Sequence, residues 1–254
     1  MMTDLVGKRV LVTGGAIRVG AAIVRAFAEA GAEVVIHCRS SREEAEELLR
    51  GIGGAEAGHG ILCCDLAAAG APEELIRNAG PLDVLVNNAS TFVRKPFDEE
   101  TEEDILASLR INTLAPIALM KAFAAALAPG KQDAAIVNLA DQAVAGPSGP
   151  SEFGYLASKK MLAEATETAA LQYAPRIRVN AVAPGPSLAP AGLEHLGMRG
   201  TLPLIPLKRS IDPEDIAAAV LFCARNRSMT GTVVQVDGGR HLCARHPVRE
   251  GRNE

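Results

Sequence analysis

Two side chains with complementary acid–base chemistry lie four residues apart in the second half of the chain. Tyr155 and Lys159 fall at the start of a stretch with helical spacing, so one helical turn brings them onto the same face. A nearby ammonium favours the phenolate form of a tyrosine, whose ordinary pKa is about 10. The pair could therefore give or take a proton, or it could be the half-exposed face of an ordinary helix.

A glycine-rich turn near the N-terminus is typical of a phosphate-binding site. It runs from Thr13 through Gly14 and Gly15 to Gly20 and joins a predicted strand to a predicted helix. Glycines let the backbone approach a pyrophosphate closely, and a helix N-terminus offers unpaired N–H groups and the positive end of its dipole. We expect a dinucleotide here, although such a turn on its own also occurs in proteins that bind none.

The residues after the second predicted strand favour NADP over NAD. An NAD-binding protein usually has Asp or Glu at this point, where it accepts the ribose 2′-hydroxyl. Here the sequence is His37-Cys38-Arg39-Ser40, and a guanidinium beside a hydroxyl suits a 2′-phosphate. Arg39 could equally be a solvated surface residue. Asp65, after the third predicted strand, could bind the adenine edge or cap the next turn.

The elements that must position these residues alternate along the chain. The predicted strands are residues 9–13, 33–37, 60–64, 82–86, 134–139, 177–181 and 232–236. The predicted helices are residues 17–30, 42–50, 72–78, 113–127, 155–173 and 213–224. Strands that are apolar on both faces and separated by helices indicate a parallel sheet covered on both sides.

We therefore predict an α/β fold with a single Rossmann-like, doubly wound domain over residues 1–254. Its sheet would have seven strands, mainly parallel, with helices on both faces. A polar C-terminal tail would occupy residues 241–254.

Composition argues against several other classes of protein. With 254 residues, 48% of them hydrophobic, the chain can bury one sizeable core. The net charge of −4 gives no basic footprint for nucleic acid or an anionic membrane. We see no signal peptide or membrane-spanning run, and the five cysteines lack metal-ligand spacing. We expect a cytoplasmic protein with reduced thiols, a small-molecule substrate and no bound metal.

Taken in order, these motifs resemble the short-chain dehydrogenase/reductase family across residues 8–242. The further motifs that carry the resemblance are Asn87-Asn88-Ala89, Asn112, Pro184-Gly185 and Val236-Asp237-Gly238-Gly239. The resemblance implies that Tyr155 is the general acid/base, that Lys159 holds the nicotinamide ribose, and that Asn112 supports a water-linked proton path. It also implies a homotetramer formed through the helices at 113–127 and 155–173.

The resemblance further assigns the residues that would bind the cofactor, NADPH/NADP+. They come from the glycine-rich turn and from the loops after the later strands. They are Thr13, Gly14, Gly15, Arg18, Val19, Gly20, His37, Arg39, Ser40, Asp65, Leu66, Asn88, Ala89, Ser90, Tyr155, Lys159, Pro184, Gly185 and Ser187.

Two departures from the family pattern resemble its pteridine reductase subgroup. Arg18 stands where a second glycine is expected, and Asp141 stands where the catalytic serine normally lies. A carbonyl under reduction develops negative charge, which an ionised Asp141 would repel. A C=N bond under reduction gains a proton on nitrogen instead, and the amino-pyrimidine edge of a pterin offers N–H donors to a carboxylate. Phe92 could stack on the flat ring.

We therefore predict an NADPH-dependent pteridine or dihydropteridine reductase of the dihydrofolate or dihydromonapterin type. Its catalytic residues would be Asp141, Tyr155, Lys159 and Asn112. Its substrate-binding residues would be Arg18, Ser90, Phe92, Asp141 and Tyr155.

Alternatives remain open at several of these positions. Asp141 could cap a turn, with Gln142 as the polar site residue, and Phe92 could be a core aromatic. The spacing from Asp141 to Tyr155 is one residue longer than in the subgroup, which places an extra residue in the loop 146–151. The protein could instead be a carbonyl reductase for a ketone, sugar or 3-oxoacyl substrate, or a catalytically silent NADPH-binding regulatory protein.

Overall fold

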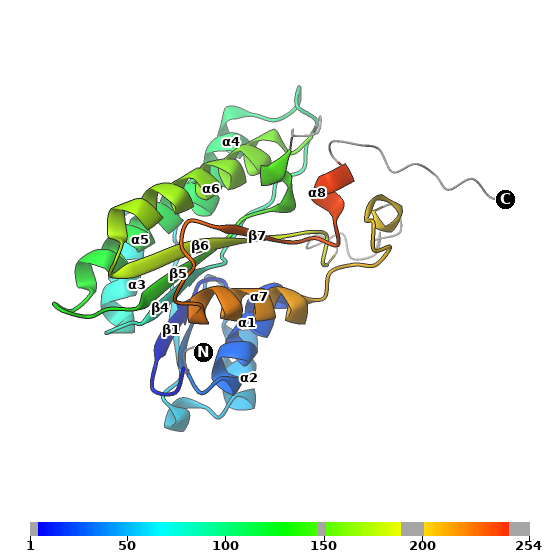
Figure 1. Cartoon of the computed structure of the whole chain (residues 1–254). Helices are drawn as coiled ribbons and strands as arrows, with labels where there is room; N and C mark the ends of the chain where they lie inside the picture. Colours follow the sequence, from blue (N-terminus) through cyan, green and yellow to red (C-terminus); the bar gives the residue numbers. More distant parts are fainter. Residues whose placement is uncertain (1–4, 147–150, 189–200, 244–254) are drawn as a thin grey trace.

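Seven parallel strands form one sheet through the centre of the molecule (Figure 1). The structure is a computed structural model and describes residues 5–146, 151–188 and 201–243. The strand order is β3-β2-β1-β4-β5-β6-β7. The strands are β1 (Arg9–Val12), β2 (Glu33–Cys38), β3 (Gly60–Cys63), β4 (Val84–Asn87), β5 (Ala134–Leu139), β6 (Ile177–Pro184) and β7 (Val233–Val236). Because every pairing is parallel, each strand needs a crossover, and helices supply it.

Helices cover both faces of the sheet, as Figure 1 shows. On one face lie α1 (Arg18–Glu29), α2 (Arg42–Gly51) and α7 (Pro213–Arg225). On the other lie α3 (Ala71–Ala79), α5 (Ala115–Ala126) and α6 (Phe153–Tyr173). Apolar side chains fill the space between each helix layer and the sheet, so the protein has one core on each face. The predicted doubly wound fold is confirmed.

Two α-helices among the described residues were not predicted from the sequence, namely those at Glu102–Leu109 and Arg240–Cys243. The helix α4 (Glu102–Leu109) precedes α5 and is joined to it by a π-helical turn at Arg110–Leu114. Its N-terminus is a capping box, in which Thr101 and Asp104 bond to each other's backbone N–H. Its first turn is a run of acidic residues, which resembles a solvated loop in the sequence. The π-helical turn carries Asn112, one of the predicted catalytic residues.

The helical run from Glu102 to Ala126 has the length and mean hydropathy, 1.3, of a membrane span. In the structure, however, Leu119, Met120 and Phe123 of this run are buried in the core between α3 and the sheet. Core helices of globular domains pass the same test of composition, so this run is explained by packing.

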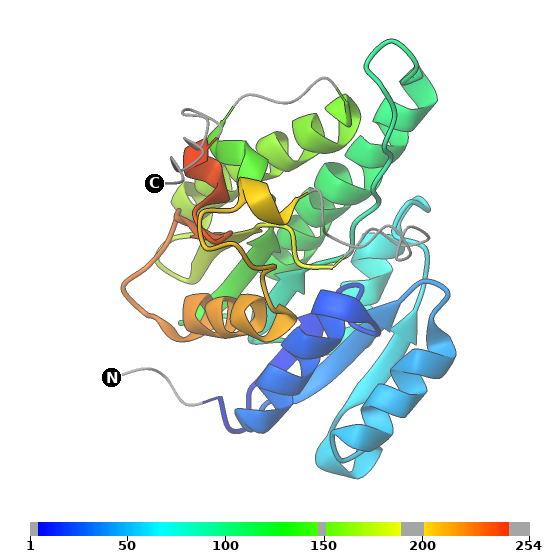
Figure 2. The ribbon, with the colours of Figure 1, turned by 90° about the vertical axis from the view of Figure 1, so that its right-hand side faces the viewer.

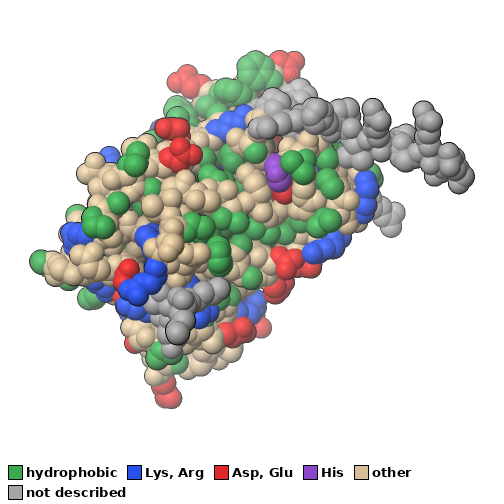
Figure 3. All heavy atoms as spheres, viewed as in Figure 1, with side chains coloured by type: hydrophobic (Ala, Val, Ile, Leu, Met, Phe, Trp, Pro, Cys, Tyr) green, Lys and Arg blue, Asp and Glu red, His purple; other side chains and the backbone are tan. Residues whose placement is uncertain are grey.

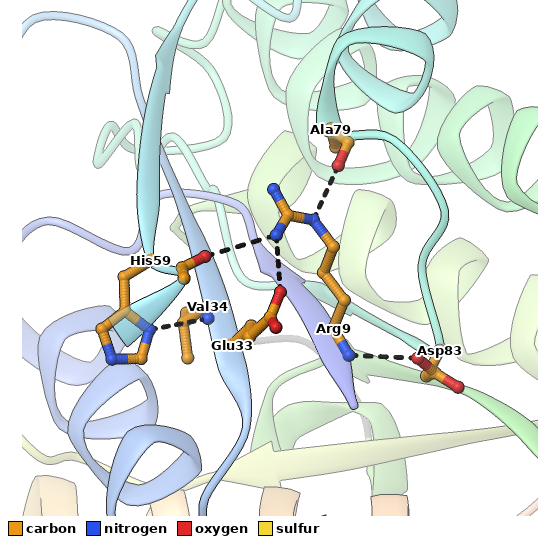
Figure 4. Close-up of polar contacts among 7 residues, drawn as sticks. Arg9, Glu33, Val34, His59, Ala79 and Asp83 are labelled. Atoms are coloured by element: carbon orange, nitrogen blue, oxygen red, sulfur yellow. Dashed lines mark hydrogen bonds and ion pairs between the residues drawn. The ribbon is translucent and has the colours of Figure 1, made fainter. Parts of the chain in front are cut away.

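Polar contacts join the amino ends of three strands, at the edge of the sheet opposite the glycine-rich turn (Figure 4). The guanidinium of Arg9 donates to Glu33 at 2.9 Å and to the Ala79 carbonyl at 2.9 Å. The backbone N–H of Arg9 donates to Asp83 at 3.0 Å, and that of Val34 donates to a ring nitrogen of His59 at 3.0 Å. These contacts fix the strand ends without entering the region where the predicted site residues gather.

The short helix α8 (Arg240–Cys243) follows β7 and lies beyond the carboxyl ends of the strands. Figure 2 views the molecule from this end. His241, assigned to the C-terminal tail from the sequence, belongs to α8, while residues 244–254 lie outside the described residues. Residues 147–150, which make up most of the loop 146–151, and residues 189–200 also lie outside them. On the face seen in Figure 3, Lys and Arg side chains are interspersed with Asp and Glu.

Candidate active site

A cavity of about 1020 Å³ lies at the carboxyl ends of the strands. It opens beside β1 and β4, which are neighbours in the sheet although β2 and β3 lie between them in the chain. The winding direction reverses there, and doubly wound sheets bind their ligands in the crevice outside such a switch point. The loops after six of the strands, together with α8, line the cavity.

The glycine-rich turn is tied to the loop after β4 through Thr13. The backbone N–H groups of Asn88 and Ala89 donate to Thr13 Oγ1 at 2.9 and 3.0 Å, and that hydroxyl donates to the Val86 carbonyl at 3.2 Å. The side-chain amide of Asn88 donates two hydrogen bonds of 2.9 Å, to the carbonyls of Thr13 and Gly14. Both loops are therefore held as one rigid edge of the cavity.

Two positions in this turn admit only glycine. A Cβ at Gly20 would lie 2.1 Å from the Gly14 carbonyl oxygen. Gly14 has φ +60°, and its Cβ would lie 2.9 Å from the Ala89 Cα. The close approach of the turn, the start of α1 and the loop after β4 leaves backbone N–H groups facing the cavity at the helix N-terminus. This cradle fits the pyrophosphate of a dinucleotide.

Arg18 occupies the first residue of α1 with a left-handed backbone, φ +58°. Glycine adopts this backbone conformation easily, whereas any other residue adopts it with strain. Arg18 nevertheless places a long cationic side chain here. Its side chain is exposed and lines the cavity. Val19, beside it, also lines the cavity.

The loops after β2 and β3 form the far end of the cavity. Arg39 and Ser40 are exposed there, as a contact to a 2′-phosphate requires. Asp65 lines the same end and accepts the Ala67 backbone N–H at 2.9 Å, so it caps the following turn while facing the cavity. Leu66 is buried beneath it.

His37 lines the cavity and also holds neighbouring segments of the backbone together. It is buried, and burial lowers the pKa of its imidazole. The ring is thus neutral: Nδ1 accepts the Gly14 N–H at 3.2 Å and Nε2 donates to the Cys64 carbonyl at 3.2 Å. His37 therefore joins the glycine-rich turn to the ends of β2 and β3.

Tyr155 and Asp141 meet at the centre of the cavity. The Tyr155 hydroxyl donates to Asp141 Oδ2 at 3.0 Å, while Asp141 Oδ1 accepts the Ala143 N–H at 2.8 Å and caps a 3-10 turn at Gln142–Ala145. Asp141 thus caps a turn, as one alternative from the sequence had it, and it also lies in the cavity against Tyr155. Gln142 also lines the cavity.

Burial disfavours the ionised form of both members of this pair. It raises the pKa of the Asp141 carboxyl, and it raises the pKa of the Tyr155 hydroxyl well above its ordinary value, with the charge of Asp141 adding to the effect. The expectation that an ammonium favours the phenolate is therefore wrong for this arrangement. The Lys159 amine lies 5.9 Å from the centre of the Tyr155 ring and donates to the Leu139 carbonyl at 2.7 Å. Tyr155 is therefore a neutral phenol whose hydroxyl donates a hydrogen bond to Asp141.

Lys159 is buried, with only 3% of its surface exposed. Burial lowers its pKa to about 8, against the opposing effect of Asp141. Its amine is therefore partly neutral near physiological pH. A lysine of this kind can hold a ribose hydroxyl and exchange a proton with it.

Asn112 is wholly buried and joins three segments of the site. Its Oδ1 accepts the Thr91 N–H at 2.8 Å and the Ser90 hydroxyl at 3.0 Å. Its Nδ2 donates to the Thr91 carbonyl at 2.9 Å and to the hydroxyl of Ser158, the neighbour of Lys159, at 3.0 Å. Every bonding group of the amide is engaged, so the side chain positions the loop after β4 against α6.

Phe92 belongs to the cavity and not to the core. Its side chain is 40% exposed, and its ring meets the Tyr155 ring edge to face with centroids 4.8 Å apart. Ser90 lines the cavity beside it. The alternative that Phe92 is a core aromatic is wrong.

The loop after β6 completes the cavity wall with Pro184, Gly185 and Ser187. A Cβ at Gly185 would lie 2.6 Å from the Asp237 Cα, so β6 and β7 meet tightly there. Among the residues that the structure describes, Ser187 is one of the few with a buried side-chain oxygen lacking a hydrogen-bond partner. A buried hydroxyl in the cavity wall that has no partner within the protein fits a bound cofactor.

Several cavity residues were missed in the sequence. Glu152 has a left-handed backbone, φ +69°, forms an ion pair with Arg94 at 3.0 Å, and has a pKa raised by burial. The ring of His241 lines the cavity, with Nδ1 2.7 Å from Asp237 Oδ2. The Asp-Gly-Gly motif just before His241 was the only signal near it. Glu152 precedes the YxxxK helix and Arg94 follows Phe92, and neither carries a motif of its own.

The sheet is parallel and doubly wound, its first turn requires glycine at two positions, and a Tyr–Lys pair lies at the carboxyl ends of its strands. This combination defines a nicotinamide-dependent oxidoreductase. Residues 15–241 match the family described as enoyl-(acyl carrier protein) reductase. The L-xylulose reductase of Cavia porcellus is 35% identical over 246 residues, 94% of this chain and 98% of that protein. The chain belongs to the short-chain dehydrogenase/reductase family.

Solved structures agree with this assignment. FolM alternative dihydrofolate reductase 1 from Brucella suis, in complex with NADP, is 34% identical, has a TM-score of 0.86, and is matched over 94% of this chain and 96% of that one. The Brucella canis protein of the same name, also with NADP, is 33% identical with a TM-score of 0.87 over 97% and 99%. The predicted cofactor, NADPH/NADP+, agrees with the family and with these structures.

Proposed function

We propose that this protein is an NADPH-dependent pteridine reductase that reduces a C=N bond of a dihydropterin, of the dihydrofolate or dihydromonapterin type. The observation that carries the proposal is the hydrogen bond from Tyr155 to Asp141 in the centre of the cavity. A neutral phenol hydrogen-bonded to a carboxyl suits a reaction in which nitrogen must be protonated. The likeness to the FolM structures supports the same interpretation.

In this proposal NADPH, when bound, supplies the hydride. Tyr155 donates its proton toward the nitrogen of the reduced bond, and Asp141, whose oxygen lies 3.0 Å from the Tyr155 hydroxyl, relays a replacement proton from solvent along the same hydrogen bond. Asp141 also accepts N–H groups of the amino-pyrimidine edge and so orients the ring. Phe92 offers an apolar face beside Tyr155 for a flat ring.

The residues proposed to hold the cofactor divide by chemistry. The turn from Thr13 to Gly20 and the N-terminus of α1 would bind the pyrophosphate, with Arg18 adding a positive charge. Arg39 and Ser40 would bind the 2′-phosphate. The remaining members would bind the adenine, the ribose or the nicotinamide, namely Asp65, Leu66, Asn88, Ala89, Ser90, Lys159, Pro184, Gly185 and Ser187.

A second candidate is a carbonyl reductase acting on a sugar. The 35% identity to L-xylulose reductase over nearly the whole chain favours it. Against it stands the place of Asp141, because its carboxyl accepts hydrogen bonds from Tyr155 and from the Ala143 N–H where an oxygen that gains negative charge would need a donor. A regulatory protein that binds NADPH without catalysis would have no use for a buried Tyr155–Lys159 pair.

The test is NADPH oxidation by the purified protein with dihydrofolate, dihydromonapterin or dihydrobiopterin, run beside L-xylulose and a panel of ketones. We expect turnover on a pterin that collapses in Asp141→Ser. Asp215→Ser, which removes an exposed carboxyl in α7, is the matched control and should retain full activity. Turnover on L-xylulose with none on pterins would establish the second candidate instead.

We also propose that the protein is a cytoplasmic homotetramer. Large apolar side chains stay exposed on the outer helices, with Leu114 53%, Met161 47% and Leu171 85% exposed. A second copy packed on α5 and α6 would cover them. Light scattering on the purified protein that returned the mass of a monomer would contradict the assembly.

A further inference from the structure

Two cysteine sulfurs lie 3.2 Å apart at the carboxyl ends of β2 and β3. Cys38 and Cys63 are register partners on these adjacent parallel strands. Neighbouring strands are separated by about 4.8 Å, which falls inside the range of Cα separations that a disulfide spans. Both residues are free thiols in the structure. The two strands therefore place both thiols within reach of a covalent link that a small shift of the strand ends would complete.

The two thiols differ in access. Cys38 is buried, with 2% of its surface exposed, and belongs to the same core cluster as Ala45 and Leu48 of α2. Cys63 is exposed on the edge strand. An oxidant from solvent would therefore reach the sulfur of Cys63 first, and the sulfur of Cys38 lies beside it as the second partner.

Charged groups around the pair come from the start of α2 and the loop before it. The pKa of Arg42 is raised by its hydrogen bond to Glu46 and then by the charge on Cys63, so its guanidinium is within electrostatic reach of that sulfur. Arg42 is the first residue of α2, whose N-terminus carries the positive end of the helix dipole. Arg42 lowers the pKa of the Cys38 thiol, but burial and the neighbouring Cys63 outweigh it and raise that pKa to about 12, so the exposed Cys63 is the thiol that meets an oxidant first.

The pair adjoins the proposed 2′-phosphate site. Cys38 lines the cavity and is followed directly by Arg39 and Ser40. A disulfide has an S–S length of about 2.05 Å, so the two sulfurs must approach each other by more than an ångström. That movement pulls the end of β2 toward β3 and displaces Arg39 and the start of α2 with it.

We propose that Cys38 and Cys63 are a modification site, at which a reversible disulfide lowers the affinity of the protein for NADPH. The inference rests on the cofactor and not on the identity of the substrate.

The chemistry needs a hydroperoxide as oxidant. The Cys63 sulfur attacks the peroxide, the O–O bond breaks, and Cys63 becomes a sulfenic acid while the peroxide leaves as an alcohol or as water. The Cys38 sulfur then attacks the Cys63 sulfur, the S–S bond forms, and the sulfenic oxygen leaves as water with the proton from Cys38. A dithiol reductant reverses the bond.

The test treats the full-length protein with hydrogen peroxide, blocks the remaining thiols with a maleimide, and maps the linked peptides by mass spectrometry. NADPH binding is then followed by fluorescence titration before and after a dithiol reductant. Cys63→Ser should form no link and should keep its affinity after peroxide. Cys64→Ser, which removes the adjacent cysteine, is the matched control and should behave as the parent does.

We expect a Cys38–Cys63 link and an NADPH affinity that falls roughly tenfold, as for the loss of one charge-assisted hydrogen bond. The reductant should restore it. A link that involves Cys64, or no link at all, would overturn the site. A Cys38–Cys63 link that leaves NADPH affinity unchanged would overturn its effect on the cofactor. Neither result depends on whether a pterin is reduced.

Discussion

The Tyr155 hydroxyl donates to one oxygen of Asp141, and the other oxygen of the same carboxyl caps the turn that follows β5. The Tyr155 hydroxyl is thus tied to the backbone after β5 through a single carboxyl. Both groups have raised pKa values because the protein surrounds them. The folded state therefore holds the Asp141 proton more tightly than the unfolded chain does, and this contribution to stability is lost as pH rises.

Asp141→Asn should separate catalysis from stability. The amide can keep the bond to Ala143 but has no proton to relay, so turnover on a dihydropterin should fall by roughly 10²-fold. It removes a buried ionisable group, so the free energy of unfolding near pH 8 should rise by on the order of 1 kcal/mol. Urea unfolding at pH 8 and pH 5 measures this, and the gain should shrink at pH 5. A variant less stable than the parent at pH 8 would contradict the argument.

Lys159 should make the free energy of unfolding increase as pH rises into the alkaline range. Its pKa of about 8 lies below that of an unfolded lysine, so the cost of its buried charge is fully present below pH 8 and is relieved as pH rises. Between pH 7.5 and 9.5 the stability of the parent relative to Lys159→Met should increase by on the order of 2 kcal/mol. Parallel urea titrations at the two pH values test it, and a difference that stays the same at both would show that the amine is not perturbed.

Arg39→Gln should change the choice between cofactors. Losing a guanidinium from a 2′-phosphate site removes a charge-assisted bond worth about 1.5–3 kcal/mol, so the KM for NADPH should rise roughly tenfold to a hundredfold. The KM for NADH, which lacks the phosphate, should stay the same. Arg50→Gln, at the other end of α2, is the matched control. An equal change for both cofactors would remove Arg39 from the phosphate site.

Gly20→Ala should disrupt the cofactor turn. The new Cβ would meet the Gly14 carbonyl oxygen at 2.1 Å, and overpacking of this kind costs about 1–3 kcal/mol. NADPH binding, measured by fluorescence, should weaken along with thermal stability. Gly51→Ala is the control, because its Cβ meets nothing within 4 Å and alanine favours the helix. Similar results for both variants would mean that the close approach is not needed.

Asn112→Ala should destabilise the protein through the bonds that it leaves open. The Thr91 N–H would lose its partner inside the protein, at about 1–3 kcal/mol for an unsatisfied group, and the Ser158 hydroxyl would keep only its bond to the Tyr155 carbonyl. Asn78→Ala, exposed on α3, should change the unfolding free energy very little. A positioning role also predicts a rise in KM for the substrate, which separates it from a role in folding alone.

The sequence determined the order of the elements, because alternating apolar strands and helices leave the doubly wound sheet as the economical arrangement. It also determined the glycine-rich turn and the Tyr155–Lys159 pair, since both lie within one local segment. It did not reveal α4, whose acidic first turn is stabilised by the cap at Thr101 and by packing on α6. Contacts between distant segments such as these cannot be predicted from the composition of the helix itself.

Only the tertiary structure decided what Asp141 and Phe92 do. Their neighbours come from distant segments: Asp141 follows β5 and Phe92 follows β4, yet both contact Tyr155 on α6. The same is true of Cys38 and Cys63, which become partners only because β2 and β3 pair in register. The charge state of Tyr155 was also decided there, because burial and a neighbouring carboxyl outweigh a lysine whose amine is bound to a backbone carbonyl. Spacing along a chain tells which groups are available, whereas pKa values and distances follow from what the fold places around them.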